Sequence, residues 1–253
     1  MGLFGWLFKP TPQELGKSGE NRVASKLFWT DIFGKEGLTL QNLYIPAGND
    51  KNVEIDLLYI TVKGIFVIES KNYSGYIFGS EDNRYWTSTL YAGKSLLGFK
   101  QVEKHHFYNP IWQNKTHINC LRKILKTEIP MFSIIVFSDR CAFKSISYNS
   151  ENTSICHYQD VGHEIGRIWR NVPNVISDEE VDEIKNNLMP FTKVSDDRKA
   201  RHVARIQSGN YSAYICPLCG GKLVLRTAKK GPYAGNQFYG CSNYPKCKFT
   251  KNI

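Results

Sequence analysis

Apolar residues recur along the chain in short alternating or continuous runs, bounded by turn-forming residues. Runs of this length, rich in Val, Ile, Leu and aromatic residues, predict strands rather than helices. The strands predicted in this way are residues 38–47, 53–60, 65–71, 131–139 and 154–161, with a strand or turn at 84–91. Gly48-Asn49-Asp50 marks the turn after the first of them.

Three segments instead show the spacing of amphipathic helices. Ser18 can cap a helix whose stripe begins at Val23, and Ser177 can cap a second that runs to about Met189. Asn109-Pro110 is a suitable start for a third helix, because Pro is tolerated in the first turn. Its apolar face carries Ile111, Ile118, Leu121 and Leu125, and another face carries Gln113 and His117. Strands interspersed with helices predict an α/β fold.

Four regions are expected along the chain: an N-terminal apolar segment, an α/β body, a charged aperiodic linker and a small cysteine-containing module. Their predicted bounds are residues 1–13, 14–193, 194–213 and 214–253. The apolar segment lacks the basic start and cleavage site of a signal peptide, so we expect it to pack on the body; a weak peripheral membrane contact is the alternative. No run approaches the ~18 apolar residues of a membrane span.

Charge is distributed unevenly between these regions. The chain has a net charge of +10, and residues 194–253 contribute 11 Lys and Arg against 2 Asp and Glu, which leaves +1 for the rest. A basic tail beside a near-neutral body predicts a polyanionic partner, nucleic acid before a membrane surface. A basic surface that serves only solubility is the plain alternative. Seven cysteines, an odd number, do not suggest a secreted disulfide framework, and a cytoplasmic location is expected.

Three charged residues interrupt the second and third predicted strands. Burying an unpaired charge costs several kcal/mol, so Asp56, Glu69 and Lys71 call for an explanation. If Ile60 pairs with Ile65, Asp56 lies across from Glu69, and alternation puts Lys71 on the same face. Two carboxylates can hold Mg²⁺ or Mn²⁺, and a nearby Lys can stabilise developing charge in phosphodiester hydrolysis. The structural alternative is an inward-facing ion cluster of Glu54, Asp56 and Lys71.

Five separated blocks of this region resemble the nuclease-related domain, which is placed in the PD-(D/E)-x-K restriction-endonuclease-like superfamily. The blocks are GKSGENRVASKL, LQNLYIP, VEIDLLYITVKGIFVIESKNYSG, YWTS and NPIWQNKTHINCLRKIL, within residues 14–130. The resemblance implies a restriction-endonuclease-like fold, with a mixed sheet flanked by helices, that continues to about residue 192. It also implies catalytic roles for Glu20, Asp56, Glu69, Lys71 and Gln113, with Asp56 and Glu69 as the magnesium ligands. From helix geometry alone, Glu20 is equally a favourable first-turn acid, and Gln113 an ordinary surface residue.

Four of the seven cysteines form two pairs near the C-terminus. Cys216 and Cys219 make a CxxC knuckle, and Cys241 and Cys247 follow after 21 intervening residues. Four thiolates in two knuckles joined by a short hairpin predict a closed tetrahedral Zn²⁺ site, on which so small a module would depend to fold. A lone CxxC could be a redox pair, but the second pair favours zinc. Cys120, Cys141 and Cys156 are expected to be non-catalytic.

Residues 214–251 also resemble the four-cysteine zinc domain at the C-terminus of type IA DNA topoisomerases, through CPxCG and the ending GCSNYPKC. That resemblance implies binding of single-stranded DNA. Basic residues could face phosphate and aromatic rings could stack on bases, although one or two rings should pack around the zinc instead. The expected contacts are Lys222, Arg226, Lys229, Lys230, Tyr239 and Tyr244.

Together these features predict a metal-dependent DNA nuclease with a zinc ribbon that grips the substrate. The alternative from another class is a non-catalytic nucleic-acid-binding or scaffold protein that keeps the nuclease fold. RNA processing is a third hypothesis, with DNA favoured over RNA as the partner. No protein partner is indicated by the sequence.

Overall fold

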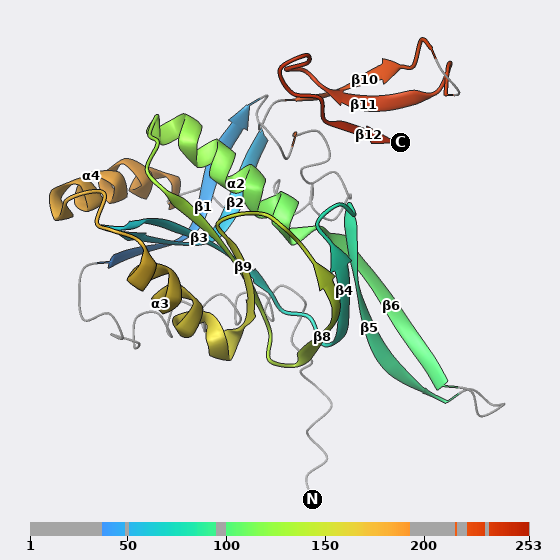
Figure 1. Cartoon of the computed structure of the whole chain (residues 1–253), viewed down its shortest axis with the longest axis horizontal. Coiled ribbons are helices and arrows are strands. Elements are labelled where there is room, and N and C mark those ends of the chain that lie inside the picture. The colour runs from blue at the N-terminus through green and yellow to red at the C-terminus, as the bar shows by residue number, and fades with distance from the viewer. Residues whose placement is uncertain are drawn as a thin grey trace, which may run out of the picture.

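A five-stranded mixed sheet forms the centre of the body (Figure 1). The computed structural model describes residues 37–48, 51–94, 100–192, 216, 222–230 and 233–252, and the structural statements below concern these residues. The strand order is β1-β2-β3-β7-β9, with β1, β2 and β3 antiparallel and β3, β7 and β9 parallel. The bounds are β1 Gly37–Gly48, β2 Lys51–Thr61, β3 Gly64–Lys71, β7 Met131–Phe137 and β9 Thr153–His157.

Helices cover both faces of this sheet, and each face has its own apolar core. The helices are α2 Pro110–Leu125, α3 Val161–Asn171 and α4 Asp178–Leu188, with short 3₁₀ turns η2 Tyr158–Asp160 and η3 Met189–Thr192. On one face, Cys120 and Leu121 of α2 and Val181 of α4 pack in one cluster with β1, β2 and β3. On the other face, Ile165 of α3 packs in a second cluster with β3, β7 and β9. The strands are therefore buried on both sides, as near-continuous apolar runs require.

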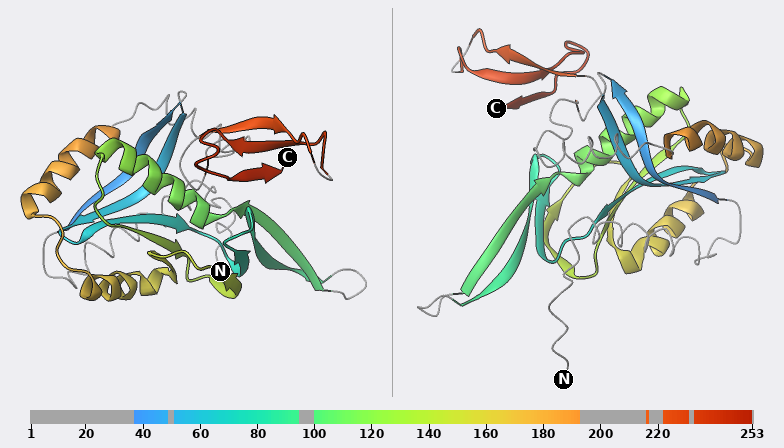
Figure 2. Two further views of the ribbon diagram at one scale, coloured as in Figure 1. Left: turned by 45° about the horizontal axis from the view of Figure 1, so that its top comes forward. Right: turned by 180° about the vertical axis from the view of Figure 1, so that it is seen from behind.

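A second, four-stranded sheet is attached at the side of the first. Its order is β6-β5-β4-β8, with β4 Gly75–Ser80, β5 Tyr85–Lys94, β6 Lys100–Tyr108 and β8 Cys141–Ser147. Ile77, Trp86 and Phe107 from its inner side pack with Ile135 and Phe137 of β7. The hairpin of β5 and β6 projects beyond the body in all three ribbon views (Figure 2).

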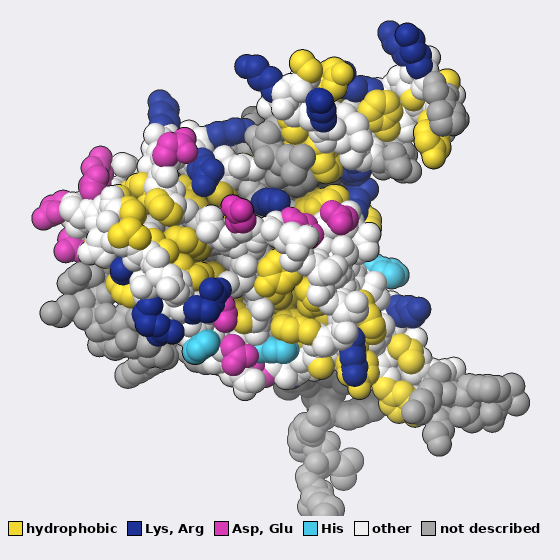
Figure 3. Space-filling model, in the orientation of Figure 1, with side chains coloured by type: hydrophobic (Ala, Val, Ile, Leu, Met, Phe, Trp, Pro, Cys, Tyr) yellow, Lys and Arg dark blue, Asp and Glu magenta, His cyan; other side chains and the backbone are white. Residues whose placement is uncertain are grey.

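The C-terminal module is a small three-stranded sheet in the order β10-β11-β12. Its strands are β10 Leu223–Thr227, β11 Gln237–Cys241 and β12 Thr250–Asn252. It contacts the body at the N-terminal half of α2, where the rings of Phe249 and Trp112 lie 5.5 Å apart, edge to face. The two ends of the molecule differ in charge. Acidic side chains gather over α4, whereas Lys and Arg side chains project from the C-terminal module (Figure 3).

The predicted α/β class with a mixed sheet is confirmed, as are the strands now numbered β1, β2, β3, β5 and β7. Ile60 does pair with Ile65. The tight turn between them needs Gly64, whose φ is +128° and whose added Cβ would lie 2.4 Å from the Pro130 carbonyl oxygen. Asn109 and Ser177 are N-caps as predicted, the latter in a full capping box.

Other predictions were incomplete. The strand predicted at 154–161 ends at His157, because η2 and α3 follow directly. The sequence patterns did not reveal β4, β6, β8 or α3. The N-terminal segment, the helix capped by Ser18 and the linker at 194–213 lie outside the described residues. Among the described helices, none combines the length and apolar character that a membrane crossing requires.

Candidate active site and nucleic-acid interface

The middle of β2 and the C-terminal end of β3 bring three of the predicted site residues together beneath α2. The recorded pairing of β2 with β3 ends at Leu57 and Ile68. Beyond it, the Ser70 N–H donates to Asp56 Oδ2 at 2.8 Å, so the Asp56 side chain bonds β3 where the ladder stops. Lys71 Nζ lies 2.6 Å from Glu69 Oε1. Alternation along the strands therefore turns Asp56, Glu69 and Lys71 to one face, as predicted.

Gln113 joins this group from the helix. Its side-chain amide donates to Glu69 Oε1 at 2.7 Å and its carbonyl oxygen accepts from Lys71 Nζ at 2.9 Å. Gln113 is only 9% exposed, so it is not the ordinary surface residue that the sequence left possible. Three side chains thus form a closed ring of hydrogen bonds, which fixes the position of the Lys71 ammonium group.

His117 is a fifth contributor, and the sequence did not single it out as a site residue. It lies one helical turn after Gln113 and is 1% exposed. Its Nδ1 is 3.5 Å from Glu69 Oε2, the oxygen that Gln113 and Lys71 do not use. The i, i+4 spacing of Gln113 and His117 was the available signal, because such residues share one helix face.

Burial and charge act against each other at this site. Burial raises the pKa of Glu69, although the Lys71 ammonium pulls it in the opposite direction and Glu54 adds to the rise. Burial lowers the pKa of Lys71, but the Glu69 carboxylate, Tyr73 and Asp56 outweigh it, so the net pKa of Lys71 is raised. Lys71 is therefore a cation at neutral pH, surrounded by acids that hold it charged.

The donor set suits a hard divalent cation. Glu69 Oε2 is fully buried and accepts no hydrogen bond within the described part of the chain. Asp56 and Glu54 supply further carboxylates on the neighbouring strand, and Glu54 Oε1 accepts from the Tyr44 hydroxyl at 2.6 Å. A buried carboxylate oxygen with unused acceptor capacity, beside other carboxylates, is what Mg²⁺ or Mn²⁺ would require. Glu20 lies outside the described residues.

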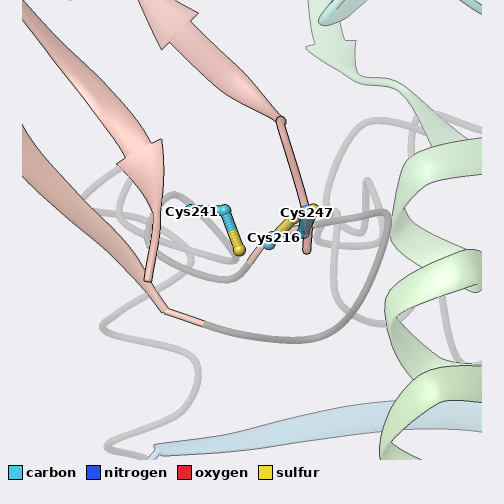
Figure 4. A group of neighbouring side chains, drawn as sticks. All are labelled: Cys216, Cys241 and Cys247. Atoms are coloured by element: carbon cyan, nitrogen blue, oxygen red, sulfur yellow. Dashed lines mark hydrogen bonds between the residues drawn. The ribbon is translucent and has the colours of Figure 1, made fainter. Parts of the chain in front are cut away.

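Three cysteines from separate parts of the C-terminal module converge on one point (Figure 4). The sulfur atoms of Cys216, Cys241 and Cys247 all lie within 4.8 Å of one another, and all three residues are buried. Cys216 and Cys247 sulfurs are 3.6 Å apart. The fourth predicted ligand, Cys219, lies outside the described residues. Soft thiolates at this spacing support a Zn²⁺ site.

The predicted nucleic-acid contacts divide into exposed and packed residues. Lys222, Lys229 and Lys230 are exposed, and Tyr244 is 61% exposed. Tyr239 packs against the cysteine cluster, in keeping with the expectation that some rings serve the zinc site. The Arg226 guanidinium donates to the Cys241 carbonyl oxygen at 3.2 Å and lies 5.8 Å from the Tyr244 ring centre. Arg226 therefore lies against the exposed ring of Tyr244.

Comparison with known proteins identifies both parts of the chain. The family model of the nuclease-related domain matches residues 15–138, and that of the topoisomerase DNA binding C4 zinc finger matches residues 213–253. The chain contains a nuclease-related domain and a topoisomerase-type C4 zinc finger. The nuclease-related domain thus includes Asp56, Glu69, Lys71 and Gln113, and the zinc finger includes all four cysteines of the predicted zinc site.

The relatives of this chain differ in how much of it they match. An uncharacterized protein of Bacillus anthracis is 28% identical over 195 residues, which are 77% of this chain and 85% of that protein. DNA topoisomerase 1 of Methanocaldococcus jannaschii is 64% identical over 39 residues, and that of Archaeoglobus fulgidus is 40% identical over 73. These stretches are 15% and 28% of this chain but only 4% and 10% of the two topoisomerases. No solved structure matches the chain.

Proposed function

We propose that the protein is a divalent-metal-dependent nuclease that hydrolyses DNA phosphodiester bonds, with its zinc finger holding the nucleic acid. The observation that carries the proposal is the group of Asp56, Glu69, Lys71 and Gln113, in which hydrogen bonds join residues from two strands and a helix. Two carboxylates beside a cation suit metal-dependent phosphodiester hydrolysis.

Asp56 and Glu69 would hold the metal ion. When bound, such an ion supplies Lewis acidity toward a phosphoryl oxygen and lowers the pKa of a bound water. Glu69 is suited to this because its Oε2 is not used by Gln113 or Lys71. The resemblance to related nucleases adds Glu20 as a further acid that helps to hold metal or water.

Lys71 would stabilise the negative charge that develops on the phosphate. Its raised pKa keeps it charged, and its bonds to Glu69 and Gln113 keep it in one place. A preorganised hydrogen-bond donor of this kind stabilises transition-state charge most strongly where the surroundings exclude water. Gln113 acts as a positioning residue for both partners, and His117 Nδ1 lies 3.5 Å from the other oxygen of the Glu69 carboxylate.

The zinc finger would supply affinity for the strand. Its exposed lysines can neutralise phosphates, and Tyr244 presents a ring on which a base can stack. The matching family is the topoisomerase DNA binding C4 zinc finger, which supports DNA as the ligand.

A non-catalytic binding protein is the second candidate, and one observation favours it. The Glu69–Lys71 ion pair is internally compensated, so it could be a structural element that needs no metal. The deciding experiment measures Mn²⁺ binding by calorimetry and cleavage of labelled DNA and RNA, for the wild type and for Glu69→Gln. A nuclease requires saturable metal binding and cleavage that both disappear in the variant. A binding protein would show neither, while retaining affinity for the strand.

A further inference from the structure

The solvent-facing side of the four-stranded sheet carries aromatic rings where polar side chains are the norm. We name this surface the outer face and define it by Tyr76, Phe78, Tyr85, Tyr91, Lys104 and Lys144. Its four aromatic residues are between 38% and 61% exposed. The opposite side of the same strands buries Ile77, Trp86 and Phe107 in the core, so core packing does not account for the exposed rings. Exposed rings gathered on one sheet face indicate a binding surface.

Strand pairing places these residues side by side. Tyr76 pairs with Thr89, which pairs in turn with Lys104, and Tyr91 pairs with Val102 on the same face. Tyr76 and Phe78 lie two residues apart on β4, roughly 6.6 Å along the strand. The rings therefore lie on two neighbouring strands of one face, with threonine and lysine side chains between them.

Positive charge accompanies the rings. The Lys144 ammonium lies 4.8 Å from the Tyr76 ring centre, and the Arg84 guanidinium lies 4.8 Å from the Tyr85 ring centre. Among the described strand residues that share this face, none is Asp or Glu. Cations interleaved with aromatic rings match a single-stranded nucleic acid, whose phosphates and bases they can meet together. Two copies of the face would repel each other, which argues against self-association.

The outer face is also continuous with the zinc finger. The Tyr85 ring contacts Tyr108 at 6.4 Å, Tyr108 contacts Trp112 at 6.3 Å, and Trp112 contacts Phe249 of the finger at 5.5 Å. We propose that a single-stranded nucleic acid leaving the zinc finger continues across the outer face and stacks its bases on Tyr85, Phe78 and Tyr76. This inference rests on the proposed role of the finger as a nucleic-acid grip, but not on cleavage.

The test uses the zinc-loaded full chain without magnesium and a fluorescently labelled oligothymidylate. Tyr76→Ala combined with Phe78→Ala should weaken binding by at least about 25-fold, because each of the two lost base-stacking contacts should weaken it about fivefold or more. Tyr76→Phe keeps the ring and should bind like the wild type. Leu90→Ala is the matched control, since Leu90 is 42% exposed on the opposite side of β5. The salt dependence of binding should not change, because no charge is removed.

A photo-crosslinking arm locates the strand directly. A bromouracil-containing strand, irradiated on the wild type, should become attached to the peptide that contains residues 76–78. Unchanged binding by the double variant, or crosslinks confined to the finger, would overturn the inference. The inference would also be overturned if the double variant kept its affinity for the strand but changed in oligomeric mass or in binding to phosphatidylserine vesicles. Cleavage with magnesium is assayed separately, so loss of the nuclease proposal would leave this result standing.

Discussion

At the scale of single residues, Glu69 is the point on which the site depends. Its two oxygens serve different partners: Oε1 accepts from Lys71 and Gln113, and Oε2 lies nearest to His117. The pKa of the carboxyl group is raised by burial. A group that is costly to keep charged is a candidate for function when geometry also places it among reactive partners.

The first prediction concerns catalysis. Asp56→Asn and Glu69→Gln should each reduce cleavage by at least ~100-fold, because they remove metal-binding charge while preserving the shape of the side chain and one acceptor oxygen. Steady-state cleavage of labelled DNA with Mg²⁺ measures the effect, and circular dichroism checks folding. Ser138→Ala, at the residue that follows β7, is the control substitution outside the site. Wild-type rates in both site variants would refute the metal site.

The second prediction separates a metal site from a structural ion pair. Lys71→Met leaves the buried Glu69 carboxylate without its ammonium partner, which should destabilise the protein by about 3–5 kcal/mol. Because a divalent cation could then neutralise Glu69, Mn²⁺ should raise the melting temperature of the variant more than that of the wild type. Thermal melts with and without Mn²⁺ provide the measurement. Equal Mn²⁺ responses in the two proteins would indicate a purely structural pair.

At the scale of elements, Asn109 joins α2 to the turn between β4 and β5. Its Oδ1 caps the helix by accepting from the Ile111 N–H at 2.9 Å. Its side-chain NH₂ lies within 3.2 Å of the carbonyl oxygens of Ser80, Glu81 and Asn83. One side chain thus holds the second sheet against the helix that carries Gln113.

The third prediction tests this junction. Asn109→Asp keeps the capping oxygen but places a carboxylate against three carbonyl oxygens, so it should destabilise the protein about as much as Asn109→Ala. We expect a loss of about 2–3 kcal/mol for each. Urea denaturation of the two variants measures it. If Asn109→Asp proved as stable as the wild type, only the helix cap, and not the bonds of the side-chain NH₂, would contribute to stability.

Elements differed in how far the sequence predicted them. The strands β2, β3 and β7 consist largely of apolar residues, so their runs could be predicted directly, whereas Ile60–Ile65 was one of several possible registers until the structure showed it. By contrast, β6 (KQVEKHHFY) and β8 (CAFKSIS) are polar because one side faces solvent, and α3 contains Gly162 and Gly166, which weaken helix propensity. Periodicity identified the helix face of Gln113 and His117, but only tertiary packing turns that face toward Glu69.

At the scale of the whole molecule, the zinc finger meets the body through Trp112, the residue beside Gln113. Lys251 of β12 lies at this junction, over the Tyr239 ring at 5.3 Å. Burial, followed by repulsion from Arg84, lowers the pKa of Lys251 to about 8 from 10.5. At neutral pH, Lys251 is therefore charged in the folded protein, although its burial and the nearby Arg84 disfavour the charged form.

The fourth prediction follows from that pKa. Because the folded pKa lies below the unfolded one, the penalty is fully present below pH 8 and is relieved as the pH rises from about 8 toward 10.5. Lys251→Met should therefore raise the melting temperature at pH 7 and flatten the rise seen in the wild type at higher pH. Thermal melts across this pH range test it, with the exposed Lys248→Met as control. Identical pH profiles for Lys251→Met and the wild type would contradict the docked contact.

The account as a whole is tested most directly by a cleavage assay on the purified, zinc-loaded full chain. Labelled single- and double-stranded DNA and RNA are incubated with the wild type and with Glu69→Gln, with Mg²⁺ present or omitted. We expect DNA cleavage by the wild type with Mg²⁺ alone, and none by Glu69→Gln, while both bind the single strand equally. Cleavage that persists in Glu69→Gln, or the absence of cleavage from a wild type that binds the strand, would contradict the proposed nuclease.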